Sequence, residues 1–263
     1  MNILLHELRA YRKSTLIWTI SLVGIAALFM SFFPSFTKDT EEFTKLLEGY
    51  PPALREAFGI NLDNFFSILG FYCYGLSFVT LCGAIQAMNL GTSIVSKEVR
   101  EKTADFLLTK PVTRSNVLTN KLLAALISII LTNIVYIVAA TLLAFQVATE
   151  DFSVKIFIML SLTVFLVQLI FLAMGIIVSV IVPKIKSVLT VSLATVFAFY
   201  FLGMFSSNDE AKRYLSPFKY FDTAYIMEHS SYEVSFLITG AIIIILAIVA
   251  SYYIYGKKDI HSV

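Results

Sequence analysis

Six long stretches of this 263-residue chain contain no Asp, Glu, Lys or Arg, and this feature limits the possible folds more than any other. They cover residues 14–37, 64–96, 122–149, 156–183, 187–208 and 234–256. A helix that crosses a hydrocarbon core about 30 Å thick needs roughly 20 apolar residues, so each stretch is long enough. Backbone groups in lipid must bond within the segment, and the sequence lacks the short alternating segments of a β-barrel, so the stretches predict helices.

The composition excludes the soluble protein classes. Hydrophobic residues make up 58% of the chain and charged residues 14%, with a mean hydropathy of +0.81, whereas a soluble domain has about 45–50% and 25%. Disordered chains and nucleic-acid-binding proteins need more charge than this. Cys73 and Cys82 lie within one apolar stretch and indicate neither a disulfide framework nor a metal site. We therefore expect an all-α integral membrane protein with the lipid bilayer, and no nucleic acid, as a partner.

The charges between the stretches predict the topology of a single membrane domain. We expect six transmembrane helices, at about residues 15–36, 65–95, 121–147, 156–182, 187–206 and 234–255. The face with both termini and segments 97–121 and 184–186 carries 13 Lys/Arg and 5 Asp/Glu, and the opposite face carries 7 and 13. The positive-inside rule then places both termini in the cytoplasm and leaves 38–63 and 207–233 as external loops. This division leaves no charge within a span.

Two flanking segments are amphipathic. Residues 2–13 carry leucines at helical spacing with basic residues mostly elsewhere, which predicts either a helix in the cytoplasmic interface or an ordinary positively charged flank. In segment 38–63, Pro51 and Pro52 must end one short helix, and a second helix is expected over 52–58. This external segment is either a structured lid or a solvated connection.

The cytoplasmic segment 97–121 is the most informative part of the chain. Glu98 and Lys102 have the favourable i, i+4 order, which predicts a short helix over about 97–108. Pro111 ends that helix, and Ser115 is the expected cap of the helix that returns to the membrane. From the residues alone the segment is either a rigid contact element or a solvated loop.

The chain carries no recognisable catalytic motif. The phosphate-binding pattern GxxxxGK[ST] is missing from the sequence, and so are HExxH and GxSxG. His6, His229 and His261 all lie outside the expected spans. We therefore predict that the chain is not an enzyme. Transporters driven by protons or ions usually keep ionisable residues at membrane depth, so the uncharged spans disfavour that class.

Neutral polar and aromatic residues are the remaining candidates for a function within the membrane. Candidate substrate-path residues are Gln86, Asn89, Asn133, Gln168, Phe199 and Tyr200. For the four amides, the alternative is an interhelical hydrogen bond, which contributes about 0.6–2 kcal/mol. For the two aromatic residues, the alternative is contact with lipid near the membrane surface.

Segment 97–121 resembles the first cytoplasmic loop of type-2 ATP-binding cassette (ABC) permeases, the membrane subunits of many bacterial exporters. The matching residues are Glu98, Arg100, Thr103, Leu107, Leu108, Pro111, Val112, Thr113, Arg114 and Lys121. Lys102 stands where that family usually has glycine. Residues 215–221, LSPFKYF, are similar to the external stretch before the last helix of the family.

The resemblance implies a coupling helix within the loop 97–118, which docks on a separate ATPase subunit. The implied contact residues are Glu98, Arg100, Thr103, Phe106, Leu107, Leu108, Pro111, Arg114, Lys184 and Lys186. The resemblance also implies that the partner ATPase binds ATP and Mg, while this chain holds no cofactor. A second permease chain, in a homodimer or a heterodimer, would complete the complex in the bacterial plasma membrane.

The resemblance to bacterial exporters of amphipathic peptides and toxins, such as phenol-soluble modulin exporters, implies export of a hydrophobic or amphipathic substrate. Drugs, lipids or sodium efflux remain alternatives within the family. An ATP-independent transporter or channel, or a membrane protein that transports nothing, is the alternative outside it.

Overall fold

The structure is a computed structural model, and its long elements are all helices. It describes residues 3–37, 40–58, 60, 62, 64–101, 113–148, 150–182, 185–204 and 210–257. The helices in chain order are α1 (Ile3–Phe36), α2 (Thr40–Glu48), α3 (Pro52–Ala57), α4 (Ile68–Glu101), α6 (Arg114–Val147), α7 (Val154–Ile181), α8 (Val188–Met204), α9 (Glu210–Arg213), the 3₁₀ turn η1 (Pro217–Lys219), α10 (Thr223–His229) and α11 (Val234–Lys257). The expected all-α membrane protein is confirmed.

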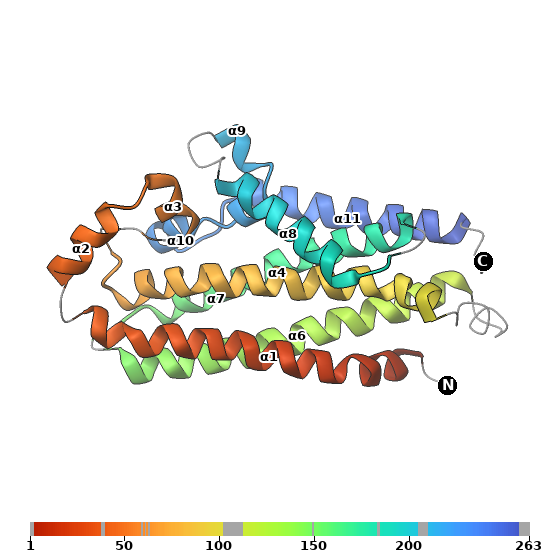
Figure 1. Ribbon diagram of the computed structural model, residues 1–263, viewed down its shortest axis with the longest axis horizontal. Helices are drawn as coiled ribbons and strands as arrows, with labels where there is room; N and C mark the ends of the chain where they lie inside the picture. Colours follow the sequence, from red (N-terminus) through yellow and green to blue (C-terminus); the bar gives the residue numbers. More distant parts are fainter. Residues whose placement is uncertain are drawn as a thin grey trace.

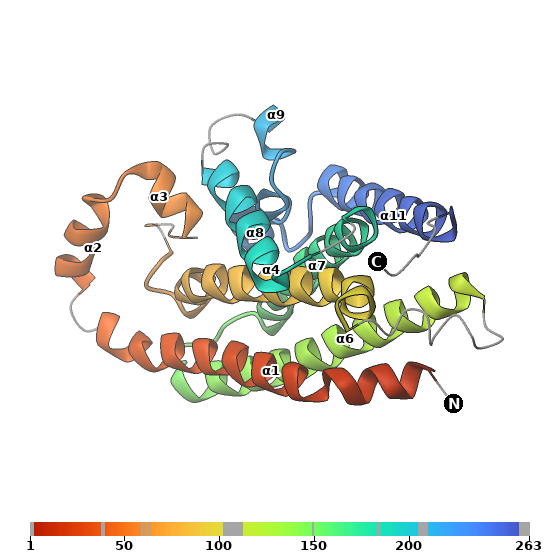
Figure 2. The same cartoon turned by 45° about the vertical axis from the view of Figure 1, so that its right-hand side comes forward.

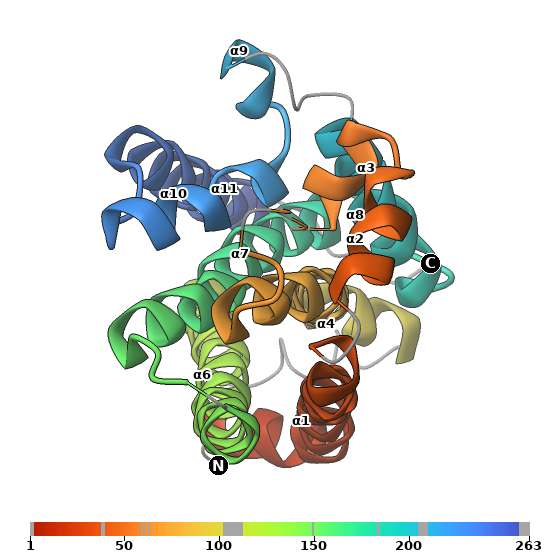
Figure 3. The ribbon, with the colours of Figure 1, turned by 90° about the vertical axis from the view of Figure 1, so that its left-hand side faces the viewer.

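The long helices pack in three layers around α4 and α7. Viewed along the bundle in Figure 3, α1 and α6 lie on one side of this central pair, and α8 and α11 lie on the other. The start of α1 and the end of α11 lie at one end of the molecule, where α4 also ends and α6 begins (Figure 1). We call this the termini end. Helices α2, α3 and α10 lie at the opposite end (Figure 1).

Glycines allow α4 and α7 to approach closely. A Cβ atom on Gly91 of α4 would lie 2.4 Å from the carbonyl oxygen of Leu172 on α7. A Cβ atom on Gly175 of α7 would lie 2.7 Å from the carbonyl oxygen of Met88 on α4. Any larger side chain at either position would push the two backbones apart. Small residues at such contacts are typical of helix packing in membranes, where lipid removes the hydrophobic driving force for association.

The structure does not confirm the expected count of six spans. Within the described residues, five helices are long and apolar enough to cross a membrane, namely α1, the Ile68–Ile94 part of α4, α6, α7 and α11. The fifth expected span, 187–206, is represented by α8, an apolar helix of only 17 residues. At about 1.5 Å per residue its described part is about 26 Å long, against a core of about 30 Å. It runs obliquely to the other helices (Figure 2).

The N-terminal segment is not a separate interfacial helix. Residues 3–13 continue without a break into the first span, so α1 is one helix of 34 residues. The sequence from Lys13 to Thr15 contains neither proline nor glycine, and the Thr15 hydroxyl donates to the carbonyl of Tyr11 one turn back. Glu7 and Tyr11 are buried in this segment. The amphipathic pattern therefore reflects packing against protein on one face of α1.

Local helix signals in the connections are mostly confirmed. Helix α2 ends at Glu48, before the two prolines, and α3 begins at Pro52. The predicted cap at Ser115 is wrong, because α6 begins one residue earlier, at Arg114. The cap is Thr113, whose side-chain oxygen accepts a hydrogen bond from the backbone nitrogen of Asn116 at 3.3 Å. A cap must precede the first helical residue, and threonine does so here.

Candidate functional site

A cavity of about 600 Å³ lies at the opposite end of the molecule, between α3, α4, α7, α8 and segment 213–227. On one side, α4 contributes Ser77 and Thr80 and α7 contributes Val167. On another side, α8 contributes Tyr200. Cavities of about 300–1,000 Å³ with mixed polar and apolar walls are typical of small-molecule sites.

The segment 215–221 forms one wall of this cavity because hydrogen bonds hold it in place. The Tyr220 hydroxyl donates to the carbonyl oxygen of Tyr214 at 2.8 Å. The Ser216 hydroxyl donates to the carbonyl oxygen of Phe199 on α8 at 2.7 Å. These bonds fix the segment against the end of α8, where its middle residues line the cavity.

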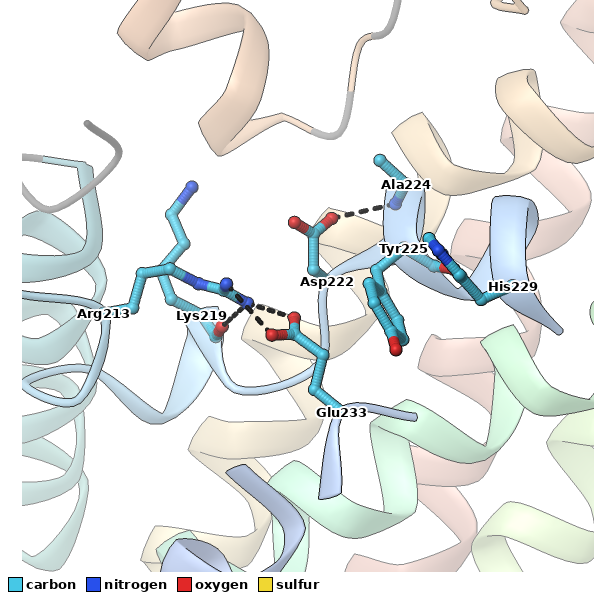
Figure 4. Close-up of polar contacts among 7 residues, drawn as sticks. All are labelled: Arg213, Lys219, Asp222, Ala224, Tyr225, His229 and Glu233. Atoms are coloured by element: carbon cyan, nitrogen blue, oxygen red, sulfur yellow. Dashed lines mark hydrogen bonds and ion pairs between the residues drawn. The ribbon is translucent and has the colours of Figure 1, made fainter. Parts of the chain in front are cut away.

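Among the residues that the structure describes, four charged side chains line the cavity, and Figure 4 shows the contacts of Arg213 and Asp222. The guanidinium of Arg213 donates to both carboxylate oxygens of Glu233, and one of its nitrogens also donates to the carbonyl of Lys219 at 3.3 Å. The Asp222 carboxylate caps α10 by accepting the backbone N–H of its second residue at 2.9 Å. Lys219 and Arg55 complete the charged lining. The walls therefore carry three cations and one carboxylate, with Glu233 neutralising one cation.

Three of the predicted path residues form one buried hydrogen-bond network. The Gln168 amide nitrogen donates to the Gln86 side-chain oxygen at 3.1 Å, and the Asn133 amide nitrogen donates to the Gln168 side-chain oxygen. Gln86 in turn donates to the Thr132 hydroxyl at 3.2 Å, which lies 3.0 Å from the Thr19 hydroxyl. The network links α1, α4, α6 and α7 inside one chain. Polar groups in apolar surroundings need such partners, so the network stabilises the packing of four helices.

The other predicted path residues lie apart from this network. Asn89 is half-buried on α4 and makes no hydrogen bond to the network within the part of the chain that the structure describes. Phe199 packs edge-on against Phe171 of α7, with ring centroids 6.0 Å apart. Tyr200 is half-buried and lines the cavity. Of the six, only Tyr200 lies at the cavity wall.

Six of the ten predicted coupling residues lie outside the residues that the structure describes. Thr103, Phe106, Leu107, Leu108, Pro111 and Lys184 lie outside the described residues. Glu98 and Arg100 belong to the last turns of α4. Arg114 is half-buried at the start of α6, and Lys186 is exposed before α8. The described members therefore occupy the ends of α4 and α6 and the connection between α7 and α8.

Sequence reasoning missed a buried ion pair near the termini end. The Lys121 ammonium donates to a carboxylate oxygen of Glu7 at 3.1 Å and to the carbonyl oxygen of Ile94 at 3.0 Å. The Lys121 side chain is 2% exposed and that of Glu7 is 10% exposed. By the expected topology, both charges belong to the cytoplasmic segments 1–13 and 97–121 that flank the spans. The pair joins α1, α4 and α6. The sequence feature that could have indicated it is that both charged residues lie within a few helical turns of an apolar stretch.

Within the described residues, no group of three or more His, Cys, Asp or Glu side chains is placed to hold a metal ion. A search among curated proteins gives no match to this chain. The family model described as ABC-2 family transporter protein matches residues 1–260. A helical membrane protein without a phosphate-binding loop is consistent with that match over nearly the whole chain. The chain therefore belongs to the ABC-2 family of transporter proteins.

Proposed function

We propose that this chain is the permease subunit of an ATP-driven exporter of hydrophobic or amphipathic substrates, with amphipathic peptides as the cargo. The observation that carries the proposal is the family match over residues 1–260. Members of this family are membrane permeases that pair with a separate ABC ATPase subunit, which binds the ATP. The choice of an amphipathic cargo rests on the uncharged, aromatic-rich spans and on the resemblance to peptide exporters.

The lengths of α4 and α6 support a coupling role for the segment between them. Each helix has 34 residues, which is about 51 Å at 1.5 Å per residue, against a hydrocarbon core of about 30 Å. Both helices are therefore longer than the core, and their charged ends, with Glu98 and Arg100 on α4 and Arg114 on α6, flank residues 102–112. In the proposal, the segment 97–118 contacts the ATPase, and ATPase closure tilts the two helices as rigid bodies. Lys184 and Lys186 would form a second, smaller contact.

The buried pair of Glu7 and Lys121 supports transmission from that contact. It binds α1 to α6 directly and reaches α4 through the carbonyl of Ile94. A displacement of α4 and α6 would therefore carry α1 with them.

The transport path in this proposal lies between two permease chains, in a two-permease, two-ATPase complex with the termini in the bacterial cytoplasm. The positive charge on the termini face supports this orientation. The mutual hydrogen bonds of Gln86, Asn133 and Gln168 favour packing over substrate contact for these three residues. Asn89, Phe199 and Tyr200 remain the proposed path residues.

The test is co-expression with a candidate ABC ATPase subunit from the same genome, followed by ATP hydrolysis measurements in lipid nanodiscs. We expect a complex of two permeases with two ATPases whose hydrolysis rate rises when an amphipathic helical peptide is added. Arg114→Asp should remove that stimulation, because it reverses a charge in the proposed contact. Arg12→Asp is the matched control, since Arg12 is an exposed residue of α1 at the same end.

The outcomes separate the parts of the proposal. A complex that drugs or lipids stimulate, but peptides do not, would contradict the cargo class alone. Full peptide stimulation of the Arg114→Asp complex would contradict the coupling assignment. Failure to form any complex with the ATPase would overturn the proposed function.

A further inference from the structure

Among the described residues, the walls of the cavity at the opposite end carry three cationic side chains and one carboxylate. Glu233 pairs with Arg213, and Arg55 and Lys219 are the other two cationic residues of the described walls. In Figure 4 the side chains of Lys219 and Asp222 point to the same side, away from the pair of Arg213 and Glu233. The hydroxyl groups of Ser77 and Thr80 add neutral polar atoms.

Arg55 has a polar atom that the described protein does not satisfy. Its Nε atom is buried and has no hydrogen-bond partner among the residues that the structure describes. Burying an N–H group without a partner is unfavourable, and most buried polar groups in native proteins are paired. A guanidinium matches the two oxygens of a carboxylate or phosphate with parallel hydrogen bonds. Arg55 is therefore suited to bind an oxyanion.

A second cavity, of about 270 Å³, adjoins the first and has mostly apolar walls. Arg55 and Ile60 line both cavities. Aromatic rings line the second one, including Phe43 and Phe58 from the segment between α1 and α4 and Tyr74 from α4 itself. A charged group and an aromatic chamber thus share one wall, which is the arrangement that an amphiphilic ligand requires.

We propose that the two cavities bind one small anionic amphiphile, with its carboxylate or phosphate at Arg55 and its apolar chain among the aromatic rings of the second cavity. The combined space fits a single-chain amphiphile, since drug-sized ligands occupy about 300–1,000 Å³, and is too small for a folded amphipathic peptide. The site lies inside one chain and does not depend on the proposed exporter function.

The probe is radiolabelled dodecanoate, measured by equilibrium binding to the purified chain in nanodiscs of zwitterionic lipid, with empty nanodiscs as background. We expect saturable binding of one dodecanoate per chain. Unlabelled dodecyl phosphate should compete and dodecan-1-ol should not, because the alcohol lacks the charge. The tighter of dodecanoate and dodecyl phosphate then identifies the natural ligand as a carboxylate, such as a fatty acid, or a phosphate, such as a lysophospholipid.

Arg55→Gln should weaken dodecanoate binding at least tenfold, which corresponds to about 1.4 kcal/mol. The matched control is Lys45→Gln, which removes a positive charge from an exposed position on α2 outside both cavity walls. Thr80→Phe keeps every charge but fills the first cavity from α4, and it should also weaken binding.

Unchanged affinity in a folded Arg55→Gln variant would overturn the proposal, and so would equal competition by dodecan-1-ol. If Arg55→Gln fails to fold, Thr80→Phe decides, and dodecanoate binding of wild-type strength in that variant would refute the site.

Discussion

Replacing Lys121 with methionine should destabilise the protein more than any other single change to a charge near the termini end. The Lys121 side chain is 2% exposed and lies 3.1 Å from a Glu7 oxygen, while the other Glu7 oxygen is buried without a hydrogen-bond partner among the described residues. Lys121→Met would leave the Glu7 carboxylate buried without its cation. Loss of one partner of a buried pair costs about 3–5 kcal/mol, because the remaining charge stays desolvated.

The double variant Glu7→Leu/Lys121→Met provides the decisive comparison. Replacement of a buried pair by apolar side chains of similar volume is often neutral or stabilising. The carbonyl of Ile94, which accepts from Lys121, lies inside α4, where backbone carbonyls already bond within the helix. We therefore expect the double variant to unfold within about 1 kcal/mol of wild type, although each single variant loses several.

The assay is reversible unfolding of the purified chain in mixed detergent micelles, followed by far-UV circular dichroism. Lys13→Met is the matched control, because Lys13 is exposed on α1, and surface substitutions usually change stability by less than about 0.5 kcal/mol. The buried-pair argument fails if Lys121→Met behaves like this control. It fails equally if the cost of the double variant is the sum of the two single costs.

Three further predictions concern other parts of the structure. Gly91→Ala should cost about 1–3 kcal/mol of unfolding free energy, because its Cβ would lie 2.4 Å from a carbonyl oxygen of α7, whereas Gly24→Ala, with nothing within 4 Å, should not destabilise in the same micelle assay. Gln168→Leu removes two buried hydrogen bonds between side-chain amides and should lower the unfolding free energy by about 0.6–2 kcal/mol without altering substrate preference. A changed preference at unchanged stability would instead assign Gln168 to the path. Burial raises the pKa of Tyr232 to about 12, and its neutral hydroxyl donates to a backbone carbonyl of α7 at 2.7 Å. The folded protein thus favours the protonated form, so the contribution of Tyr232 to stability is full below pH 10 and is lost as the pH rises towards 12. Thermal unfolding from pH 9 to 12 should show this decline, with a smaller slope in Tyr232→Phe.

Helix type and helix position were predictable because the membrane makes them a local property of the chain. A long apolar stretch must satisfy its own backbone in lipid, so α1, α4, α6, α7 and α11 follow from hydropathy without knowledge of their neighbours. The break between α2 and α3 is equally local, since proline cannot continue a helix.

The helix lengths depended on contacts that a hydropathy pattern does not contain. Residues 3–13 have the amphipathic pattern of an interfacial helix, but Glu7 and Tyr11 are buried, and the segment continues into α1. Helix α8 lies within the long apolar stretch 187–208, but its described part has 17 residues and lies obliquely across the bundle. In both cases the packing of neighbouring helices determines where the apolar face points.

The sequence by itself determined that this chain is a helical membrane protein, and its loop residues indicated the permease family to which it belongs. Only the tertiary structure decided which polar residues meet. Lys121 is 114 positions from Glu7, and Gln168 is 82 positions from Gln86. The lining of the cavity likewise comes from α3, α4, α7, α8 and the segment before α11. The physical reason is that hydropathy depends on each segment alone, whereas a buried hydrogen bond, an ion pair or a cavity depends on which face each helix turns towards its neighbours.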